Sequence, residues 1–288
     1  MMNHPAELAV HQYLENAKGR GTNMADSTLD KICDDIRAAL VRQFGSDAKR
    51  GKFKPRMSNI GRPTCQLWYD KNKPEAALPR STTFVMNMMI GDIVEAVFKG
   101  LLTEAGVTYE ENEKTSVEFS DGTTVNGTAD ISINGSVDDI KSASDWSYRN
   151  KFESYDTLAR FDDFGYVAQL AGYAKGLDKQ AGGWWVINKA NGNFKYVPAD
   201  GLNLTKEIDK LSTNLDVVES NEFKRCFEPV EETFRGKPTG NKVLTKTCSF
   251  CRYKHACWKG LQEIPSLVSQ AKIPKIVSYV EIAKENIA

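Results

Sequence analysis

Two aspartates and a lysine are spaced so that one tight turn would bring all three to the same face of a β-hairpin. Asn134-Gly135 is a pair typical of two-residue hairpin loops, and counting outward from such a loop places Asp130 directly opposite Asp139. Side chains alternate along a strand, so Lys141 lies on the same face as Asp139. The opposite face carries the apolar residues Ala129, Ile131, Ile133 and Ile140. The sequence therefore predicts a hairpin with one reactive face and one face buried in a core.

Two opposed carboxylates need a compensating positive charge. At about 5 Å and an effective dielectric constant of about 20, their repulsion is on the order of 3 kcal/mol. Together with the backbone carbonyl of Ile140 and a further acid, Asp130 and Asp139 would form the hard oxygen site that Mg²⁺ or Mn²⁺ prefers. Glu95 is the best candidate for that acid, because it lies among apolar residues and needs a partner.

Such a site could hydrolyse a phosphodiester bond. The metal would polarise a phosphoryl oxygen and lower the pKa of a bound water. Lys141 would orient that water or help to deprotonate it, and its charge would stabilise the transition state. A lone Asp-x-Lys triplet most often forms a surface ion pair instead. Strand pairing shifted by one residue would place Asp138 on the active face and turn Lys141 away, which is chemically poorer.

A second site is indicated by the cysteines. Cys248, Cys251 and Cys257 lie within ten positions, a spacing at which a chain can fold around one metal centre. Cys65 is the most plausible fourth ligand and would join the region before the carboxylate motifs to the region after them. Zn²⁺ could occupy the same thiolates, with His255 in place of one of them. Cys226 has no neighbouring cysteine in the sequence and is expected to be a plain thiol.

Periodicity predicts the elements that must position these residues. Helical patterns cover Ser27 to Phe44, Phe84 to Leu102, Thr157 to Leu177 and Leu202 to Val218. A three-stranded antiparallel meander is expected over Lys114 to Lys141, and a second hairpin pairs Trp184 to Ile187 with Phe194 to Val197. Gln169 and Tyr173 lie one turn apart on a single helix face. The basic segment Lys49 to Arg62 could contact phosphates or simply be solvated.

Four motifs occur in one order along the chain: Gly91-x-x-x-Glu95, Gly127-Thr128-Ala129-Asp130, Asp139-Ile140-Lys141 and Gln169-x-x-x-Tyr173. This set resembles that of RecB-like nucleases of the PD-(D/E)xK superfamily, over Phe84 to Val197. The resemblance implies an α/β, restriction-endonuclease-like core with a mixed sheet flanked by helices. It implies that Glu95, Asp130 and Asp139 bind the metal, that Lys141 is catalytic, and that Gln169 and Tyr173 position the DNA end or support the metal side. Many relatives have His where Glu95 stands.

The cysteine layout is similar to that of iron-sulfur nucleases of the AddB and CRISPR-adaptation type. These also have one cysteine upstream of the nuclease motifs and a C-x2-C-x5-C arrangement downstream. The resemblance implies a 4Fe-4S cluster on Cys65, Cys248, Cys251 and Cys257, with Zn²⁺ as the alternative. The cluster would be structural and would lie in a helical lobe formed by segments before and after the nuclease core.

These inferences divide the chain into five regions. They are a helical N-terminal region with the basic loop (1–57), the upstream part of the iron-sulfur lobe (58–83), the nuclease core (84–198), the helical downstream part of the lobe (199–262) and a tail (263–288). The expected function is that of a DNA exonuclease acting on single strands or ends with 5′ to 3′ polarity. A non-catalytic nucleic-acid-binding protein and a zinc-stapled endonuclease are the alternatives. DNA is the expected partner, and a helicase or recombinase is a further candidate.

Composition argues against several other kinds of site and of protein. Lys plus Arg and Asp plus Glu both total 38, so any site for a polyanion must be local. The only histidines are His4, His11 and His255, which leaves little for a His-rich metal site or a Ser-His-Asp triad. The first twenty residues lack the apolar core of a signal peptide, and no run of about 18 apolar residues occurs. A cytoplasmic protein of a bacterium or phage-infected host is expected, with no membrane partner and an open oligomeric state.

Overall fold

The computed structural model describes residues 4–18, 24–45, 53–220 and 222–283. It divides the chain into two compact units, which are treated separately below. The first unit comprises Met1–Gly61 and Ser81–Leu215, and the second comprises Arg62–Arg80 and Asp216–Ala288. Each unit has its own sheet, and the two units alternate along the sequence, so that Ser81–Leu215 of the first lies between the two segments of the second.

A five-stranded sheet forms the centre of the first unit. Its strands, in spatial order, are β1 (Glu110–Glu118), β2 (Thr124–Ile133), β3 (Ser136–Ala143), β4 (Gln180–Asn188) and β5 (Phe194–Pro198). Neighbouring strands are antiparallel except for β3 and β4, which are parallel and therefore need a long crossover connection. The predicted meander and the predicted second hairpin are both confirmed.

The Asn134-Gly135 turn sets the register of the central hairpin as predicted. Both turn residues have positive φ, 52° and 77°, which the primed two-residue turns require. Ile133 pairs with Ser136, and Ile131 pairs with Asp138. Continuing this register by one residue brings Asp130 opposite Asp139. The pairing shifted by one residue is therefore excluded.

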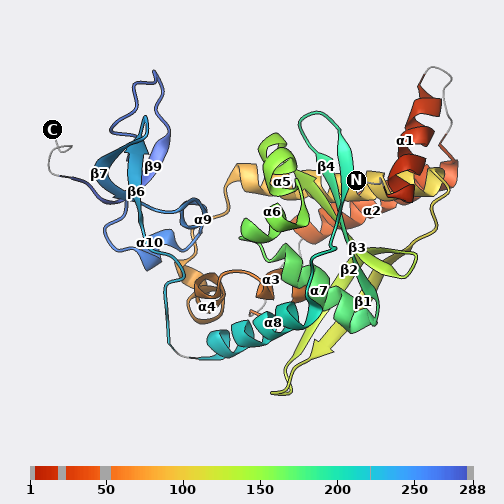
Figure 1. The fold of residues 1–288 in the computed structure, drawn as a ribbon, viewed down its shortest axis with the longest axis horizontal. Helices are drawn as coiled ribbons and strands as arrows, with labels where there is room; N and C mark the ends of the chain where they lie inside the picture. The colour runs from red at the N-terminus through yellow and green to blue at the C-terminus, as the bar shows by residue number, and fades with distance from the viewer. Residues whose placement is uncertain (1–3, 19–23, 46–52, 221, 284–288) are drawn as a thin grey trace. The chain divides into compact units, whose positions relative to one another are not determined.

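Helices cover the sheet of the first unit (Figure 1). They are α1 (Pro5–Ala17), α2 (Asp26–Phe44), α3 (Met57–Ile60), α5 (Thr82–Glu104), α6 (Tyr155–Arg160), α7 (Tyr166–Leu177) and α8 (Leu204–Glu219), with a short π-helix at Ser147–Lys151. The predicted apolar face of the hairpin is confirmed, because Ile131, Ile133 and Ile140 share one core cluster with Phe98 and Leu102 of α5. The helix α7 packs against β1 to β4.

The predicted helix over Thr157 to Leu177 is interrupted. It consists of α6 and α7, separated by residues 161–165. The break has a local cause, because the carboxylate of Asp162 accepts hydrogen bonds from the amides of Tyr166 and Val167, each at 2.9 Å. This capping starts a new helix. Gly165, at φ 76°, makes the turn into that helix.

The second unit contains a sheet that the sequence analysis missed. Its four strands are antiparallel, in the order β6 (Val230–Phe234), β7 (Lys237–Val243), β9 (Ile276–Glu281) and β8 (Gln262–Pro265). The remaining elements are α4 (Thr64–Asn72), a 3₁₀ turn at Pro74–Ala76, α9 (Lys246–Ser249) and α10 (Lys254–Cys257). The helix predicted over Leu202 to Val218 is confirmed as α8, but the expectation that 199–262 is helical and 263–288 a tail was wrong, because these ranges also contain β6 to β9.

Side-chain hydrogen bonds explain how such short, largely exposed strands hold together. Tyr279 donates from its hydroxyl to Glu232 at 2.9 Å, and the same carboxylate accepts from Asn241 at 2.7 Å. The Asn241 carbonyl in turn accepts from the amide of Ala283. These contacts join residues far apart in sequence, so no short-range pattern predicts them. No helix in the described part of the chain is both long and apolar enough to cross a bilayer.

Candidate functional site

The hairpin β2–β3 brings together Asp130, Asp139 and Lys141. The backbone amide of Ile140 donates to Asp130 Oδ2 at 2.9 Å, so the side chain of Asp130 turns toward β3. The ammonium group of Lys141 forms an ion pair with Asp139. The three residues that the turn chemistry placed on one face are therefore neighbours in space.

Asp139 is the most constrained member of this group. Its side chain is 0% exposed, and neither oxygen accepts a hydrogen bond of normal geometry within the described residues, although Lys141 lies beside it. Burial raises the pKa of Asp139, and the charge of Lys141 opposes this rise. Burying a carboxylate with so few partners is costly. Its oxygens are thus well suited to a further cation.

Lys141 remains charged despite its surroundings. Burial alone would lower its pKa, but the negative charges of Asp139 and Asp130 outweigh burial and raise it. Tyr166 lies beside the ammonium group, with 5.0 Å between Nζ and the ring centroid. Lys141 therefore acts as a cation at neutral pH, and a proton-accepting role requires the acids to be neutralised first.

The helix α5 supplies Glu95 to the same region. Gly91 lies where α5 packs on β3, and a Cβ there would make only an ordinary contact, 3.5 Å from Ser142 Oγ. Glu95 follows one turn later and accepts a hydrogen bond from Lys99 at 2.7 Å. Burial, and then the charge of Asp130, raises the pKa of Glu95. Glu95 is thus electrostatically coupled to the hairpin acids, while Lys99 neutralises part of its charge.

No three Asp, Glu, His or Cys side chains among the described residues are grouped tightly enough to hold a metal ion. The acids are instead paired with lysines, Asp139 with Lys141 and Glu95 with Lys99. A divalent ion would therefore compete with these two ion pairs.

Gln169 and Tyr173 lie on α7, close enough to Asp139 for its charge to act on Tyr173. Gln169 Nε2 donates to the Tyr173 hydroxyl at 2.8 Å, and both side chains are buried. Burial, and then the charge of Asp139, raises the pKa of Tyr173. Both side chains are therefore held inside the first unit by their mutual hydrogen bond.

Gly127 has a packing reason for its place in the motif that ends at Asp130. A Cβ at this position would lie 2.5 Å from Tyr173 Cε1 and 2.8 Å from Met57 Cγ. Only a residue without a side chain lets α7 bring Tyr173 this close to β2. The position of Tyr173 therefore requires glycine at residue 127.

Replacing Gly127 with Ala is expected to lower the free energy of unfolding by about 1 to 3 kcal/mol, because the new methyl group overpacks this contact. Gly91→Ala is the matched control. It introduces only an ordinary contact with Ser142 and should be neutral or stabilising by up to about 1 kcal/mol through helix propensity. Urea unfolding measures both, and equal effects would contradict this account of Gly127.

Asp130→Asn is expected to change how stability depends on pH in the metal-free protein. Burial, followed by the charge of Asp139, raises the pKa of Asp130 from 3.8 to about 6. Between these values the folded protein holds a proton that the unfolded chain has released. This contribution to stability is complete below pH 3.8 and is lost as the pH rises through about 6. The variant should therefore gain stability relative to wild type from about pH 5 to pH 8, as measured by urea unfolding. A difference in unfolding free energy between variant and wild type that stays constant over this pH range would contradict the raised pKa of Asp130.

Asp138 faces the other side of the sheet. It accepts hydrogen bonds from Trp185 Nε1 at 3.1 Å and from the Tyr196 hydroxyl at 2.9 Å. Burial raises its pKa to about 7, and these hydrogen bonds oppose the rise. Two adjacent aspartates therefore differ in role, because alternation sends one into the apolar core and the other toward Lys141.

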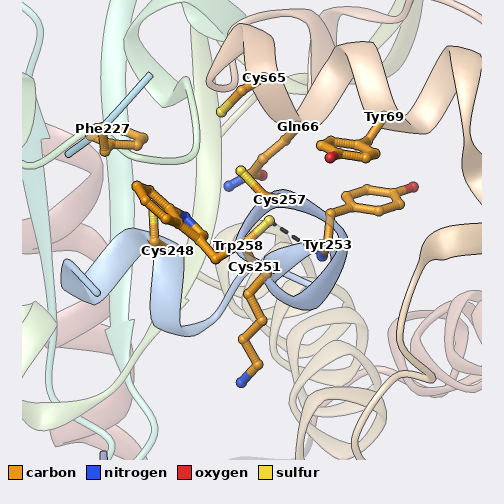
Figure 2. A pocket seen from close by; sticks show the side chains of 10 residues that line it. Cys65, Gln66, Tyr69, Phe227, Cys248, Cys251, Tyr253, Cys257 and Trp258 are labelled. Carbon is orange, nitrogen blue, oxygen red and sulfur yellow. Dashed lines mark hydrogen bonds between the residues drawn. The ribbon is translucent and has the colours of Figure 1, made fainter. Parts of the chain in front are cut away.

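In the second unit, one cavity is lined by all four cysteines that were predicted to bind a cluster. Cys65 lies on α4, Cys248 on α9, Cys251 in the following turn and Cys257 on α10 (Figure 2). Aromatic side chains complete the lining, namely Tyr69, Phe227, Tyr253 and Trp258. Tyr69 and Tyr253 stack with 5.0 Å between their centroids. The cavity is therefore rich in sulfur and screened by rings.

Contacts within the second unit join its early segment to its late one. The amide of Leu78 donates to the carbonyl of Arg252 at 2.8 Å, and the guanidinium of Arg252 donates to the Leu78 carbonyl at 3.2 Å. The hydroxyl of Tyr253 donates to Asp70. These bonds place Cys65 beside the C-x2-C-x5-C segment even without a bound group.

A fifth cysteine, Cys226, lies next to this set, contrary to the expectation that it is isolated. Its Sγ accepts from the amide of Cys65 at 3.0 Å and lies 3.4 Å from Thr64 Oγ1. The hydrogen bond with the Cys65 thiol lowers the pKa of Cys226 to about 6 and raises that of Cys65. No spacing signal could have revealed a partner so distant in sequence.

His255, the alternative zinc ligand, is directed elsewhere. Its Nε2 lies 2.7 Å from Glu263 Oε2, and the residue does not line the cysteine cavity. His255 is therefore paired with an acid and does not join the four cysteines in the cavity lining. The basic segment Lys49 to Arg62 lies outside the described part of the chain up to residue 52.

The described residues form a mixed α/β protein with a five-stranded mixed sheet and a four-stranded antiparallel sheet, flanked by helices. Neither a family model nor a curated protein matches the chain. Among solved structures, the crystal structure of SSO0001 matches with a TM-score of 0.44 and 13% sequence identity. That match covers 82% of this chain and 98% of the other.

Proposed function

We propose that this protein is a metal-dependent deoxyribonuclease of the RecB-like PD-(D/E)xK type that also carries a cysteine-bound iron-sulfur cluster. The observation that carries the proposal is the grouping of Asp130, Asp139 and Lys141 at the β2–β3 hairpin, with both Asp139 oxygens buried and lacking normal hydrogen bonds. A restriction-endonuclease-like core over 84–198 is consistent with the mixed sheet and the covering helices α5 and α7.

The acids would hold the ion and the lysine would act on the phosphate. Asp139 and Asp130, with the Ile140 carbonyl and Glu95, are the residues that would hold Mg²⁺ or Mn²⁺. When bound, the ion supplies polarisation of the phosphoryl oxygen and a water of lowered pKa. Lys141 would leave its ion pair with Asp139 and place its positive charge against the scissile phosphate.

Gln169 and Tyr173 have a supporting role in this proposal. Their mutual hydrogen bond holds the Tyr173 ring against Gly127, which lies three residues before Asp130 on β2. Side chains held by packing and hydrogen bonds keep a catalytic group in register. The pair therefore positions the hairpin acids and need not touch the substrate.

In the second unit, Cys65, Cys248, Cys251 and Cys257 would hold a 4Fe-4S cluster. The chemistry of the donor set suits it, because four cysteine side chains line one cavity and the surrounding rings would shield a cluster from water. Zn²⁺ on the same thiolates is the alternative. The role would be structural, since these cysteines join two segments separated by the whole of Ser81–Leu215.

The test is a cleavage assay on anaerobically purified protein. Single strands labelled at the 5′ or 3′ end, duplexes and circular single strands are incubated with Mg²⁺, Mn²⁺ or EDTA. We expect ion-dependent degradation of linear single strands, early release of short products from the 5′-labelled strand, and resistance of the circle. Binding without cleavage under any of these conditions would point to a non-catalytic protein and overturn the proposal. Cleavage of the circle would instead indicate an endonuclease.

A further inference from the structure

Three exposed aromatic side chains lie on the loops that follow β3 and α6. Trp146 is 50% exposed, Phe161 is 43% exposed and Phe164 is 53% exposed. Trp146 immediately precedes the π-helix Ser147–Lys151, a rare element that is often found at functional sites. The Trp146 and Phe161 centroids are 6.3 Å apart, at 71° to each other. Scattered exposed rings are ordinary, but rings grouped in this way call for a partner.

One of these rings, Phe164, is linked to Lys141 through Tyr166. The Lys141 ammonium lies 5.0 Å from the centroid of Tyr166, and Tyr166 stacks on Phe164 with 5.5 Å between centroids. Lys151 lies between the same two rings, with its Nζ 4.5 Å from the Tyr166 centroid and 5.0 Å from that of Phe164. Phe164 is therefore joined through Tyr166 to the proposed catalytic lysine, and two ammonium groups lie beside this pair of rings.

The loop that presents Phe161 and Phe164 is held in place. Asp162, between them, caps α7 through two backbone amides. Gly165 follows at φ 76°, and any Cβ there would collide with the backbone of Gly61. On the inner side, the buried ring of Phe152 stacks on Tyr166 at 6.0 Å. The outward position of the two phenylalanines is thus imposed by backbone contacts, and not by a lack of local structure.

We propose that Trp146, Phe161 and Phe164 stack on unpaired bases of a DNA single strand whose phosphodiester lies at Lys141. This rests on the proposed nuclease function and names its substrate form. Aromatic rings stack on any base, and Lys141, whose ammonium group lies beside Tyr166, provides nearby charge for a phosphate. In a duplex the bases already stack on each other, so these rings favour single strands. Because they offer few hydrogen bonds to base edges, little sequence preference is expected.

The test is binding in EDTA, where no cleavage can occur. Fluorescence anisotropy compares wild type with Trp146→Ala and Phe164→Ala on a labelled single strand. At about 1 to 3 kcal/mol per stacked base, each variant should bind about 5- to 150-fold more weakly. Trp146→Phe should restore binding to within about threefold of wild type. Phe44→Ala is the matched control, because Phe44 is a similarly exposed ring on α2, and it should change nothing.

A strand with the same phosphates but abasic sites should bind wild type as weakly as the alanine variants bind the intact strand. Equal affinity for intact and abasic strands, or equally tight binding of duplex, would overturn the inference. A change in oligomeric state with unchanged DNA affinity would assign these rings to a protein interface and also overturn it. Normal binding by active alanine variants defeats only this inference, whereas ring-dependent binding without cleavage defeats only the nuclease proposal.

Discussion

Asp139→Asn should reduce ion-dependent DNA cleavage by about a thousandfold or more. The change removes the buried charge that would hold the ion, and it leaves a group of nearly the same size. Lys141→Gln should have a similar effect, because it removes the cation that would face the phosphate. Residues that act as a unit are not additive, so the double variant should be little worse than either single one. Initial rates on a labelled single strand measure all three.

Asp138→Asn provides the matched control for this prediction. It makes the same chemical change one residue earlier, but on the core side of the sheet, where Asp138 accepts from Trp185 and Tyr196. Stability should fall, while cleavage by the folded protein should stay within about tenfold of wild type. Thermal unfolding must accompany each rate, because Asp139→Asn also breaks an ion pair. If Asp139→Asn kept more than a tenth of the activity, the site assignment would be wrong.

The second large effect is expected from Cys251→Ser. Anaerobically purified wild type should be brown, and the variant should lose its visible absorption together with its iron and sulfide. Metal centres in small domains contribute on the order of 10 kcal/mol to folding. Loss of the cluster should therefore make Arg62–Arg80 and Asp216–Ala288 sensitive to protease. Absorption spectra, metal analysis and limited proteolysis provide the three measurements.

Two further cysteines sharpen this experiment. Cys33→Ser alters an exposed thiol on α2 in the other unit and should leave colour and protease resistance unchanged. Cys226→Ser should keep the colour if Cys65 is the fourth ligand, and should lose it if Cys226 takes that place. A colourless wild type with one zinc per chain would establish the zinc alternative. A wild type with neither metal would refute the cysteine centre altogether.

The carboxylate site could be predicted from the sequence because its geometry is local. One turn pair, Asn134-Gly135, sets the register, and alternation then decides which face Asp138, Asp139 and Lys141 occupy. Glu95 and Tyr173 required more, since their approach depends on how α5 and α7 pack on the sheet. Glu95 and Tyr173 were singled out by the order of the four motifs along the chain, because periodicity alone does not show that their helices approach the hairpin.

Features that depend on distant contacts were missed. The strands β6 to β9 are short and largely exposed, so neither length nor alternation distinguishes them from loops. Cys226 reaches Cys65 across 161 positions, and no spacing rule covers such a pair. The break between α6 and α7 depends on Asp162, whose capping role competes with an otherwise continuous helical pattern. That break creates the exposed loop of Phe161 and Phe164.

The placement of Ser81–Leu215 between the two segments of the second unit governs the order in which the protein can assemble during synthesis. Cys65 leaves the ribosome early, but Cys248, Cys251 and Cys257 follow only near the end of the chain. The five-stranded sheet can therefore form while the thiols still await their partners. Closing so long a loop is entropically costly, and prior folding of the intervening segment shortens the effective span. If the proposed metal centre forms, its loading would be a late event in maturation, and ribosome-stalled chains ending before Cys248 should already contain the five-stranded sheet.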